Sequence, residues 1–137
     1  MIELYESADQ LGVEIFTGNI PHTVSFSIPG YVALDYRLIG NSAEERCAAA
    51  HELGHNARNA FYTRNDPRYI RLRCENKADK WAIKKLIPKD EFQEAIQRGY
   101  QEPWEIAEYF NVTEDFAYKA MWYYRYGNLA VEKRSFE

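Results

Sequence analysis

The sequence predicts an α+β fold, in which a small antiparallel sheet packs on one long helix and a helical C-terminal half follows. Two observations support this prediction. Between residues 13 and 36, apolar residues recur at every second position, which is the spacing of strands. From residue 42 onward, capping and stop residues mark successive helices. The length of 137 residues suits one core, so we expect a single domain, with the sheet and first long helix in residues 1–60 and a helical part in residues 61–137.

The first elements are a helix and a set of short strands. Apolar residues at helical spacing predict an amphipathic helix that ends at Gly12. Residues 13–16 form a short strand, and residues 24–28 alternate between apolar side chains and serine. Pro29-Gly30 interrupts this run and residues 31–36 resume it, so we expect a hairpin. Pro-Gly suits a type II turn better than the primed turns of tight hairpins.

The second half is expected to be helical. A long helix should cover about residues 43–60, because Ser42 can cap its first turn while Glu45 reaches back as in a capping box. Residues 65–67 mark a loop, and a second helix should cover about residues 74–87 and end at the following proline. Three shorter helices are expected near residues 89–98, 103–110 and 114–125.

The first long helix carries the most informative pattern of the chain, His51-Glu52-Leu53-Gly54-His55, an HExxH motif. Residues four apart lie on one helix face, with about 6 Å of rise between them, so both imidazoles can bind one Zn²⁺. The glutamate between them is placed to take a proton from an attacking water. Two of the three histidines in the chain lie here, which makes chance a poor explanation. The motif predicts a zinc hydrolase with Glu52 as its catalytic base.

A catalytic zinc site usually takes three protein ligands, so the third must come from another element. Glu75, twenty residues after His55, is our candidate. Asp79 lies one turn further on the same helix face, where it can hydrogen-bond a ligand histidine and fix its tautomer. His-Glu-x-x-His followed by Glu-x-x-x-Asp is the arrangement of thermolysin-like zincins, so we expect a zincin-like fold. Gly54 would keep the helix slim beside the metal.

Several other residues stay open as parts of the site. Cys47 or Cys74 would supply a fourth ligand if the metal were structural, although a free cysteine is more commonly a small buried hydrophobe. His22, Tyr62 and Tyr69 are rival donors to the oxyanion, and the sequence does not rank them.

The charges are unevenly distributed along the chain. Residues 58–89 carry ten basic and three acidic side chains, whereas residues 1–57 carry two and eight, and residues 90–137 carry five and ten. The basic stretch predicts a solvated helix face that pairs with the acidic flanks, with an acidic partner or nucleic acid as the alternative. Residues 104–124 look like a helix-turn-helix, but they offer few donors for base edges. We therefore expect packing or protein binding there, and no direct nucleic-acid binding.

The composition also bears on the compartment. The N-terminus has no basic start followed by an apolar segment, and no run approaches the roughly 18 apolar residues of a membrane span. Two cysteines do not make a disulfide framework. A reduced, cytoplasmic protein is expected.

Together these residues resemble the ImmA/IrrE family of zinc metallopeptidases, which occurs in phages, mobile elements and their bacterial hosts. The zinc motifs are shared with many peptidases, and the stretch Ala-Asp-x-aromatic-Ala at residues 78–82, followed by Leu-Ile-Pro at residues 86–88, indicates this family. Lys77 replaces a frequent acid and Trp81 a usual phenylalanine. Lys77 lies off the metal face and Trp81 keeps an aromatic side chain, so the chemistry is unaffected.

The resemblance implies a protein substrate, a helix-turn-helix transcriptional repressor that is inactivated by site-specific cleavage. Two alternatives remain: a non-proteolytic anti-repressor that binds the repressor, and a DNA-binding regulator with a structural metal. Glu52→Gln separates them, because only the enzyme needs this carboxylate. We also expect the strand at residues 31–36 to pair with an extended substrate.

Overall fold

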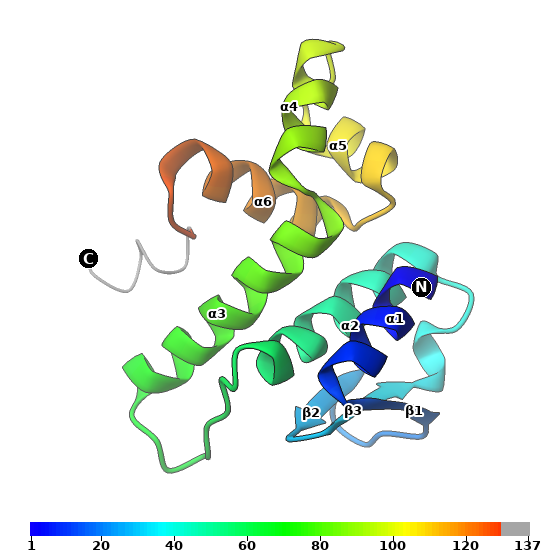
Figure 1. Ribbon diagram of the computed structural model, residues 1–137, viewed down its shortest axis with the longest axis vertical. Helices are drawn as coiled ribbons and strands as arrows, with labels where there is room; N and C mark the ends of the chain where they lie inside the picture. Colours follow the sequence, from blue (N-terminus) through cyan, green and yellow to red (C-terminus); the bar gives the residue numbers. More distant parts are fainter. Residues whose placement is uncertain (130–137) are drawn as a thin grey trace.

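The computed structural model describes residues 1–129 and has the α+β fold that the sequence predicts (Figure 1). The elements in chain order are α1 (Ile2–Leu11), β1 (Glu14–Gly18), β2 (Ser25–Ile28), β3 (Tyr31–Asp35), the 3-10 helix η1 (Tyr36–Leu38), α2 (Ser42–Ala57), α3 (Arg68–Leu86), α4 (Lys89–Gln97), α5 (Pro103–Phe110) and α6 (Glu114–Tyr126). The predicted first helix and the three short C-terminal helices are confirmed. Within residues 1–129, no helix is both long and apolar enough to cross a membrane.

The sheet is mixed, and the prediction of an antiparallel sheet is wrong for one of its two strand pairs. Its strand order is β1-β3-β2, with β2 antiparallel and β1 parallel to β3. The chain passes from β1 to β2 over the end of β3, where Asp35 Oδ2 accepts a hydrogen bond from the Ile20 amide at 2.7 Å. The predicted hairpin then inserts β3 between the two other strands. Its turn has Gly30 at a φ of 86°, as the third position of a type II turn requires.

This strand order corrects the expectation that residues 31–36 pair with an extended substrate. β3 is the central strand, and both of its edges are already hydrogen-bonded to β1 and β2. Within residues 1–129, the outer edge of β2 has no neighbouring strand. The alternating pattern reveals a strand but does not give its position in the sheet, because the position depends on the path of the connections.

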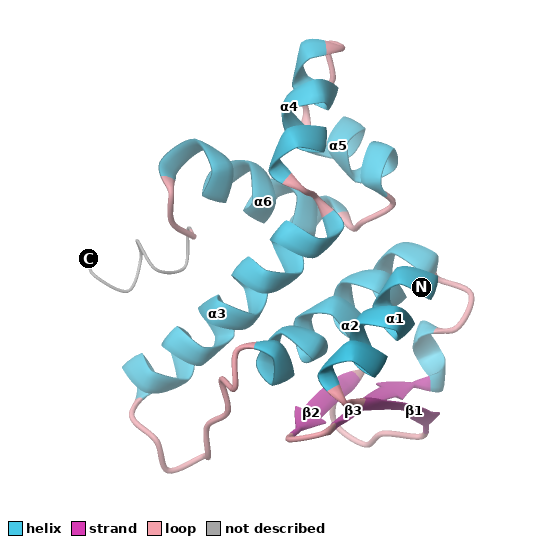
Figure 2. Cartoon of the chain, viewed as in Figure 1, coloured by secondary structure: helices cyan, strands magenta, loops and turns pink. Residues whose placement is uncertain are grey.

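Helix α2 forms the centre of the molecule. Figure 2 shows the strands on one side of α2 and α3 on the other, with α4, α5 and α6 gathered at the far end of α3. Buried apolar side chains fill both interfaces of α2, and they include Val32, Leu34, Ala49, Ala50, Leu53 and Ile83. This packing fixes α2 against the sheet and against α3 at once.

Helices α2 and α3 approach each other closely at Gly54. A Cβ atom at this position would lie 2.5 Å from the carbonyl oxygen of Ala78 and 2.9 Å from its Cα. Atoms of the backbone cannot move away cheaply, so only glycine fits. The predicted role of Gly54, a slim helix at this point, is confirmed.

Two helix starts differ from the sequence prediction. Asn41 is the N-cap residue of α2, without a side-chain hydrogen bond, and Ser42 Oγ instead accepts one from Asn111 Nδ2 at 2.7 Å. The predicted capping box of Ser42 and Glu45 is therefore wrong, because a tertiary contact takes the serine. Helix α3 begins at Arg68, directly after Pro67. Proline has a fixed φ and no N–H to satisfy, so a helix can start at once behind it.

The C-terminal helices pack as the sequence analysis favoured. Thr113 caps α6, and its Oγ1 accepts a hydrogen bond from the Phe116 amide at 3.2 Å. The inner face of α6 is buried at Phe116, Ala117 and Ala120.

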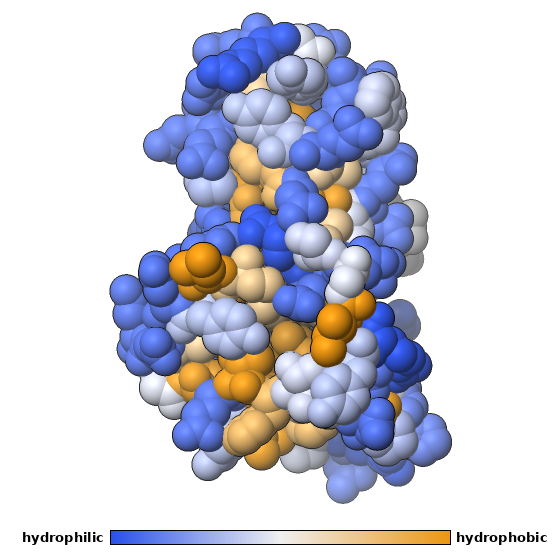
Figure 3. Space-filling model, turned by 90° about the vertical axis from the view of Figure 1, so that its right-hand side faces the viewer, coloured by the Kyte–Doolittle hydropathy of each residue, from blue (hydrophilic) through white to orange (hydrophobic). Residues whose placement is uncertain are grey.

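The sheet and α1 leave apolar side chains at the surface. Figure 3 shows these side chains gathered over the part of the molecule that α1 and the sheet form, with hydrophilic residues around them. Exposed apolar residues of these elements include Ile2, Phe16 and Ile28.

Candidate metal centre and active site

Three side chains singled out from the sequence converge between α2 and α3. The donor atoms of His51, His55 and Glu75 all lie within 4.8 Å of one another. The two imidazole Nε2 atoms are 3.2 Å apart. Glu75 Oε2 lies 2.8 Å from Nε2 of His55 and 3.3 Å from Nε2 of His51. We call these three residues the donor cluster.

The outer nitrogens of both imidazoles have hydrogen-bond partners. His55 Nδ1 lies 2.6 Å from the carbonyl oxygen of Ala60, and His51 Nδ1 lies 2.7 Å from Asp79 Oδ1. A carbonyl or a carboxylate only accepts, so each Nδ1 carries a hydrogen and each Nε2 of the neutral ring presents a lone pair. Two lone pairs 3.2 Å apart repel each other unless a cation lies between them. Asp79 occupies the position that the sequence analysis gave it.

The electrostatics of the donor cluster favour positive charge at its centre. Burial alone would lower the pKa of His51, but hydrogen bonds to Asp79 and Glu75 outweigh it and raise that pKa to about 10. Burial alone would likewise raise the pKa of Glu75, yet the two histidines hold it well below its usual value. In both cases the surroundings stabilise a cation between the imidazoles, either a proton or a metal ion.

Helix α6 contributes a lysine beside the donor cluster. Lys119 Nζ lies 3.1 Å from Asp79 Oδ2, so the lysine neutralises the carboxylate that orients His51. The sequence analysis missed Lys119. It lies forty residues after Asp79 in the chain, and only the packing of α6 against α3 brings the two together.

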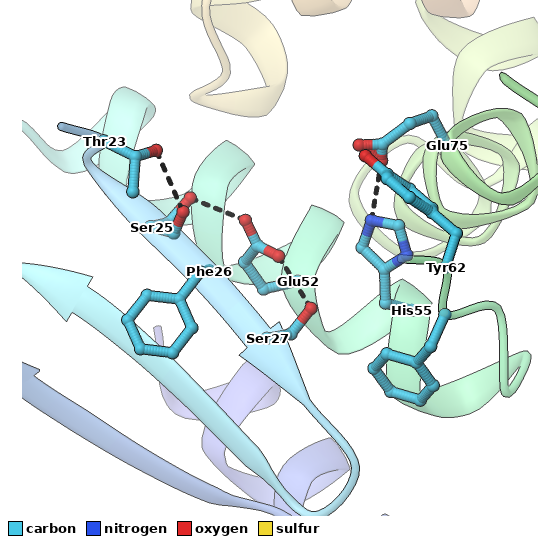
Figure 4. Close-up of a pocket in the computed structure, with 9 residues that line it drawn as sticks. Thr23, Ser25, Phe26, Ser27, Glu52, His55, Tyr62 and Glu75 are labelled. Carbon is cyan, nitrogen blue, oxygen red and sulfur yellow. Dashed lines mark hydrogen bonds and ion pairs between the residues drawn. The ribbon is translucent and has the colours of Figure 1, made fainter. Parts of the chain in front are cut away.

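Glu52 projects from α2 towards β2 rather than towards the His55 imidazole (Figure 4). Ser25 Oγ donates to Glu52 Oε2 at 2.7 Å, and Ser27 Oγ donates to Glu52 Oε1 at 2.8 Å. Both oxygens of this buried carboxylate are therefore fixed by hydroxyl groups of one strand. The serines were seen in the sequence only as the polar positions of an alternating strand. Their exposed neighbours Phe26 and Ile28 point the other way, so the polar face of β2 is the one turned inward.

A single cleft contains both glutamates. It is lined by Thr23, Ser25, Phe26, Ser27, Glu52, His55, Phe61, Tyr62 and Glu75. Figure 4 shows Glu52 on the side of β2, with His55, Tyr62 and Glu75 facing it from the other side. The cleft is open to solvent and runs along β2, the strand whose outer edge is unpaired within residues 1–129.

Of the three residues considered as oxyanion donors, Tyr62 is the one that lines the cleft. Its ring lies 6.4 Å from that of His55. Partial burial, together with the negative charge of Glu75, raises the pKa of the Tyr62 phenol, so its hydroxyl stays protonated and able to donate. Tyr69 and His22 are exposed and are not among the lining residues.

Both cysteines have contacts away from the donor cluster. Cys47 Sγ accepts a hydrogen bond from the Thr113 amide at 3.5 Å, and Cys74 Sγ donates to the carbonyl of Phe61 at 3.7 Å. Within residues 1–129, neither cysteine belongs to the group of side chains that could hold a metal ion. The alternative of a closed, cysteine-containing site finds no support there.

A helix with two histidines four residues apart, a third acidic donor on the next helix and a small sheet beside the cleft define the class of zincin-like metallopeptidases. The chain belongs to the Peptidase M78 family, described as the IrrE N-terminal-like domain, whose family model matches residues 8–121. The resemblance to ImmA/IrrE proteins found in the sequence is thereby confirmed. Among the curated proteins compared with the chain, none matches it.

Proposed function

We propose that this metallopeptidase is a zinc-dependent endopeptidase that inactivates a helix-turn-helix transcriptional repressor by site-specific cleavage. His51, His55 and Glu75 would hold the metal, and Glu52 would be the catalytic base. The observation that carries the proposal is the convergence of three donor atoms within 4.8 Å in the same cleft as Glu52.

The donor set suits zinc. Two imidazole nitrogens and one carboxylate oxygen are the protein ligands of many catalytic zinc sites, in which a further position stays open. In His51 and His55, Nδ1 is hydrogen-bonded to Asp79 and to the carbonyl of Ala60, so both Nε2 atoms are available as ligands. A bound zinc ion would act as a Lewis acid that polarises the scissile carbonyl and activates water.

Residues of the chain would transfer the proton, orient the catalytic carboxylate and stabilise the developing negative charge. Ser25 and Ser27 hold the Glu52 carboxylate in place. Each of its oxygens has a second lone pair, which would accept the proton of the attacking water. The same carboxylate would return that proton to the nitrogen of the leaving amine. The Tyr62 hydroxyl would donate a hydrogen bond to the oxygen on which negative charge develops.

The outer edge of β2 is suited to hold the substrate. A peptide that pairs with it lies in extended form along the cleft, with its main chain held by hydrogen bonds. In this proposal, β2 pairs with the extended substrate in place of residues 31–36. The choice of a repressor as substrate rests on the likeness to ImmA/IrrE proteins, and it implies that the protein works in the cytoplasm with its target.

The test measures repressor relief and repressor integrity side by side. The repressor is the one encoded beside this protein, and the enzyme is wild type or Glu52→Gln, each loaded with zinc. We expect wild type to cut the repressor at one site and to abolish operator binding, and Glu52→Gln to do neither. An intact repressor with unchanged operator binding at a high ratio of wild-type enzyme would refute the proposal. Relief of repression by both proteins, without cleavage, would instead identify an anti-repressor that acts by binding.

A further inference from the structure

The segment between α2 and α3 and the first turns of α3 form an exposed surface rich in arginine. The only acidic side chain in residues 58–73 is Asp66, whose Oδ2 accepts a hydrogen bond from the Thr63 amide at 2.7 Å. The basic ones are all exposed, namely Arg58, Arg64, Arg68, Arg71 and Arg73. Within residues 1–129, none of these arginines forms an ion pair with a carboxylate. For these arginines, the predicted pairing with the acidic flanks is not found within residues 1–129.

Two of these arginines share a helix face with the donor cluster. Arg71 precedes Glu75 by four residues and Arg68 precedes it by seven. At these spacings both lie on the Glu75 side of α3, about 6 and 10 Å away along the helix axis. We call Arg68 and Arg71 the arginine pair. Glu75 lines the cleft, and the pair lies beyond it along the same side of α3, outside the lining residues.

Arg71 lies one helical turn before Glu75 on the same side of α3, and Glu75 lines the cleft. Tyr62 also lines the cleft next to Glu75 (Figure 4). The arginine pair therefore borders the space that a bound peptide would occupy.

The distances from Glu75 to the arginine pair match the distances between nearby residues of an extended peptide. An extended chain advances about 3.3 Å per residue, so positions about 6 and 10 Å from Glu75 correspond to roughly two to three residues from the bond that is cut. The guanidinium group binds a carboxylate through two parallel hydrogen bonds, which makes arginine well suited to select aspartate or glutamate.

We propose that the arginine pair is a specificity subsite that binds an acidic side chain of the protein substrate, roughly two to three residues from the cleaved bond. This inference rests on the peptidase function proposed above and adds the chemical class of the substrate segment. The cleft then holds the substrate at three points: the main chain on β2, the scissile carbonyl at the donor cluster and a carboxylate on the arginine pair.

A peptide fits the arginine surface better than a nucleic acid. The chain has a net charge of −4, which repels a long polyanion. A short acidic segment instead interacts with the arginines within about one Debye length, roughly 8 Å at physiological salt. The arginine pair also lies next to a peptidase cleft, and the α6 helix offers few groups that recognise bases.

The experiment measures binding in the Glu52→Gln background, so that peptides are not consumed. The probes are fluorescently labelled short peptides of equal length, one rich in glutamate and one with glutamine in its place, and a labelled single-stranded DNA of similar length. The proteins carry Arg68→Ala with Arg71→Ala, or the control pair Lys84→Ala with Lys85→Ala. The control removes the same charge from exposed positions near the C-terminal end of the same helix.

We expect the acidic peptide to bind more tightly than the glutamine peptide, and the arginine double variant to weaken acidic-peptide binding roughly tenfold, as the loss of two exposed charge-assisted contacts implies. The lysine control should leave it unchanged. Equal binding of both peptides, or equal loss in the control, would overturn the proposal. Tighter binding of DNA that depends on the arginine pair would also overturn it, and would assign the surface to nucleic acid.

A second measurement separates this inference from the peptidase function itself. Wild-type enzyme with zinc is incubated with a mixed peptide library, and the cut sites are identified by mass spectrometry. Cuts with aspartate or glutamate enriched at a fixed distance on one side, and without that enrichment in the arginine double variant, support the subsite. Cuts that require Glu52 but show no acidic preference would refute the subsite alone. The absence of any cut would count against the peptidase function, while the binding experiment still decides on the arginine pair.

Discussion

The cleft has a glutamate at each of its two walls, and the groups that surround the two carboxylates differ. On the β2 wall, the Glu52 carboxylate is bound by two neutral hydroxyls, Ser25 and Ser27. On the α3 wall, the Glu75 carboxylate lies against two imidazoles, which lower its pKa. A carboxylate between two imidazoles is suited to bind a cation, whereas a carboxylate held by two hydroxyls is fixed in orientation. The different surroundings are the basis for the two different roles that we propose for these glutamates.

The walls also differ in how they are built. The α3 wall is joined to α2 by backbone contact at Gly54 and by buried apolar packing. The β2 wall is an outer strand that contacts Glu52 through side-chain hydroxyls. We therefore expect substitutions on the α3 side to change metal binding and substitutions on the β2 side to change catalysis with the metal in place.

The largest of these effects is expected at Asp79. Asp79→Asn removes the charge that orients His51, and outer-shell changes of this kind typically weaken metal affinity by about 10- to 100-fold. Competition with a chromogenic zinc chelator measures the affinity directly. An affinity equal to that of wild type would show that His51 does not depend on Asp79, and the α3 wall would lose its proposed role.

The close approach of α2 and α3 is tested by Gly54→Ala. The added Cβ would meet the Ala78 backbone at 2.5 Å, so the helices must separate. We expect a loss of about 1–3 kcal/mol in the free energy of unfolding, although alanine favours a helix by about 1 kcal/mol. Urea denaturation measures the change in the free energy of unfolding. Gly18→Ala is the control, because nothing lies within 4 Å of a Cβ at that position; an equally small change in both variants would contradict the close approach.

The β2 wall is tested by Ser25→Ala combined with Ser27→Ala. Glu52 loses both hydrogen bonds, and we expect kcat to fall about tenfold while zinc affinity stays at the wild-type value. Steady-state cleavage of a peptide found to be cut by the wild type provides kcat, and chelator competition provides the affinity. A matching loss of zinc affinity would contradict the division between the two walls.

The smallest effect is expected at Lys119. Its ion pair with Asp79 is partly exposed, and such pairs contribute about 0–1 kcal/mol. Lys119→Met should therefore weaken zinc affinity by at most about fivefold, and Lys119→Arg should restore it. A loss as large as that of Asp79→Asn would show that α6 controls the donor cluster more strongly than its single ion pair implies.

The donor cluster and Asp79 could be predicted from the sequence, and the contacts of the β2 wall could not. Helical periodicity converts the spacing of His51 and His55, and of Glu75 and Asp79, into shared faces, so a motif identifies them before any packing is known. The contacts of Ser25, Ser27 and Lys119 depend on how distant elements come together. The serines lie 27 and 25 residues before Glu52 in the chain, and their strand carries no motif.

The sheet illustrates the same limit. The alternation of apolar residues located all three strands, yet it gave neither the parallel pairing of β1 with β3 nor the central position of β3. The strand order depends on the path of the segment that connects β1 to β2. This segment crosses the end of β3, where the Ile20 amide donates a hydrogen bond to Asp35. Similarly, the predicted cap at Ser42 gave way to a contact with Asn111, which lies far along the chain.

The most direct test of the account is the zinc content of three proteins: wild type, Glu75→Ala and Glu52→Gln. Each is stripped with a chelator, refilled with zinc, dialysed and measured by elemental analysis. We expect one zinc ion per chain for wild type and for Glu52→Gln, and none retained by Glu75→Ala. Zinc retained in full by Glu75→Ala, or taken up by none of the three, would contradict it.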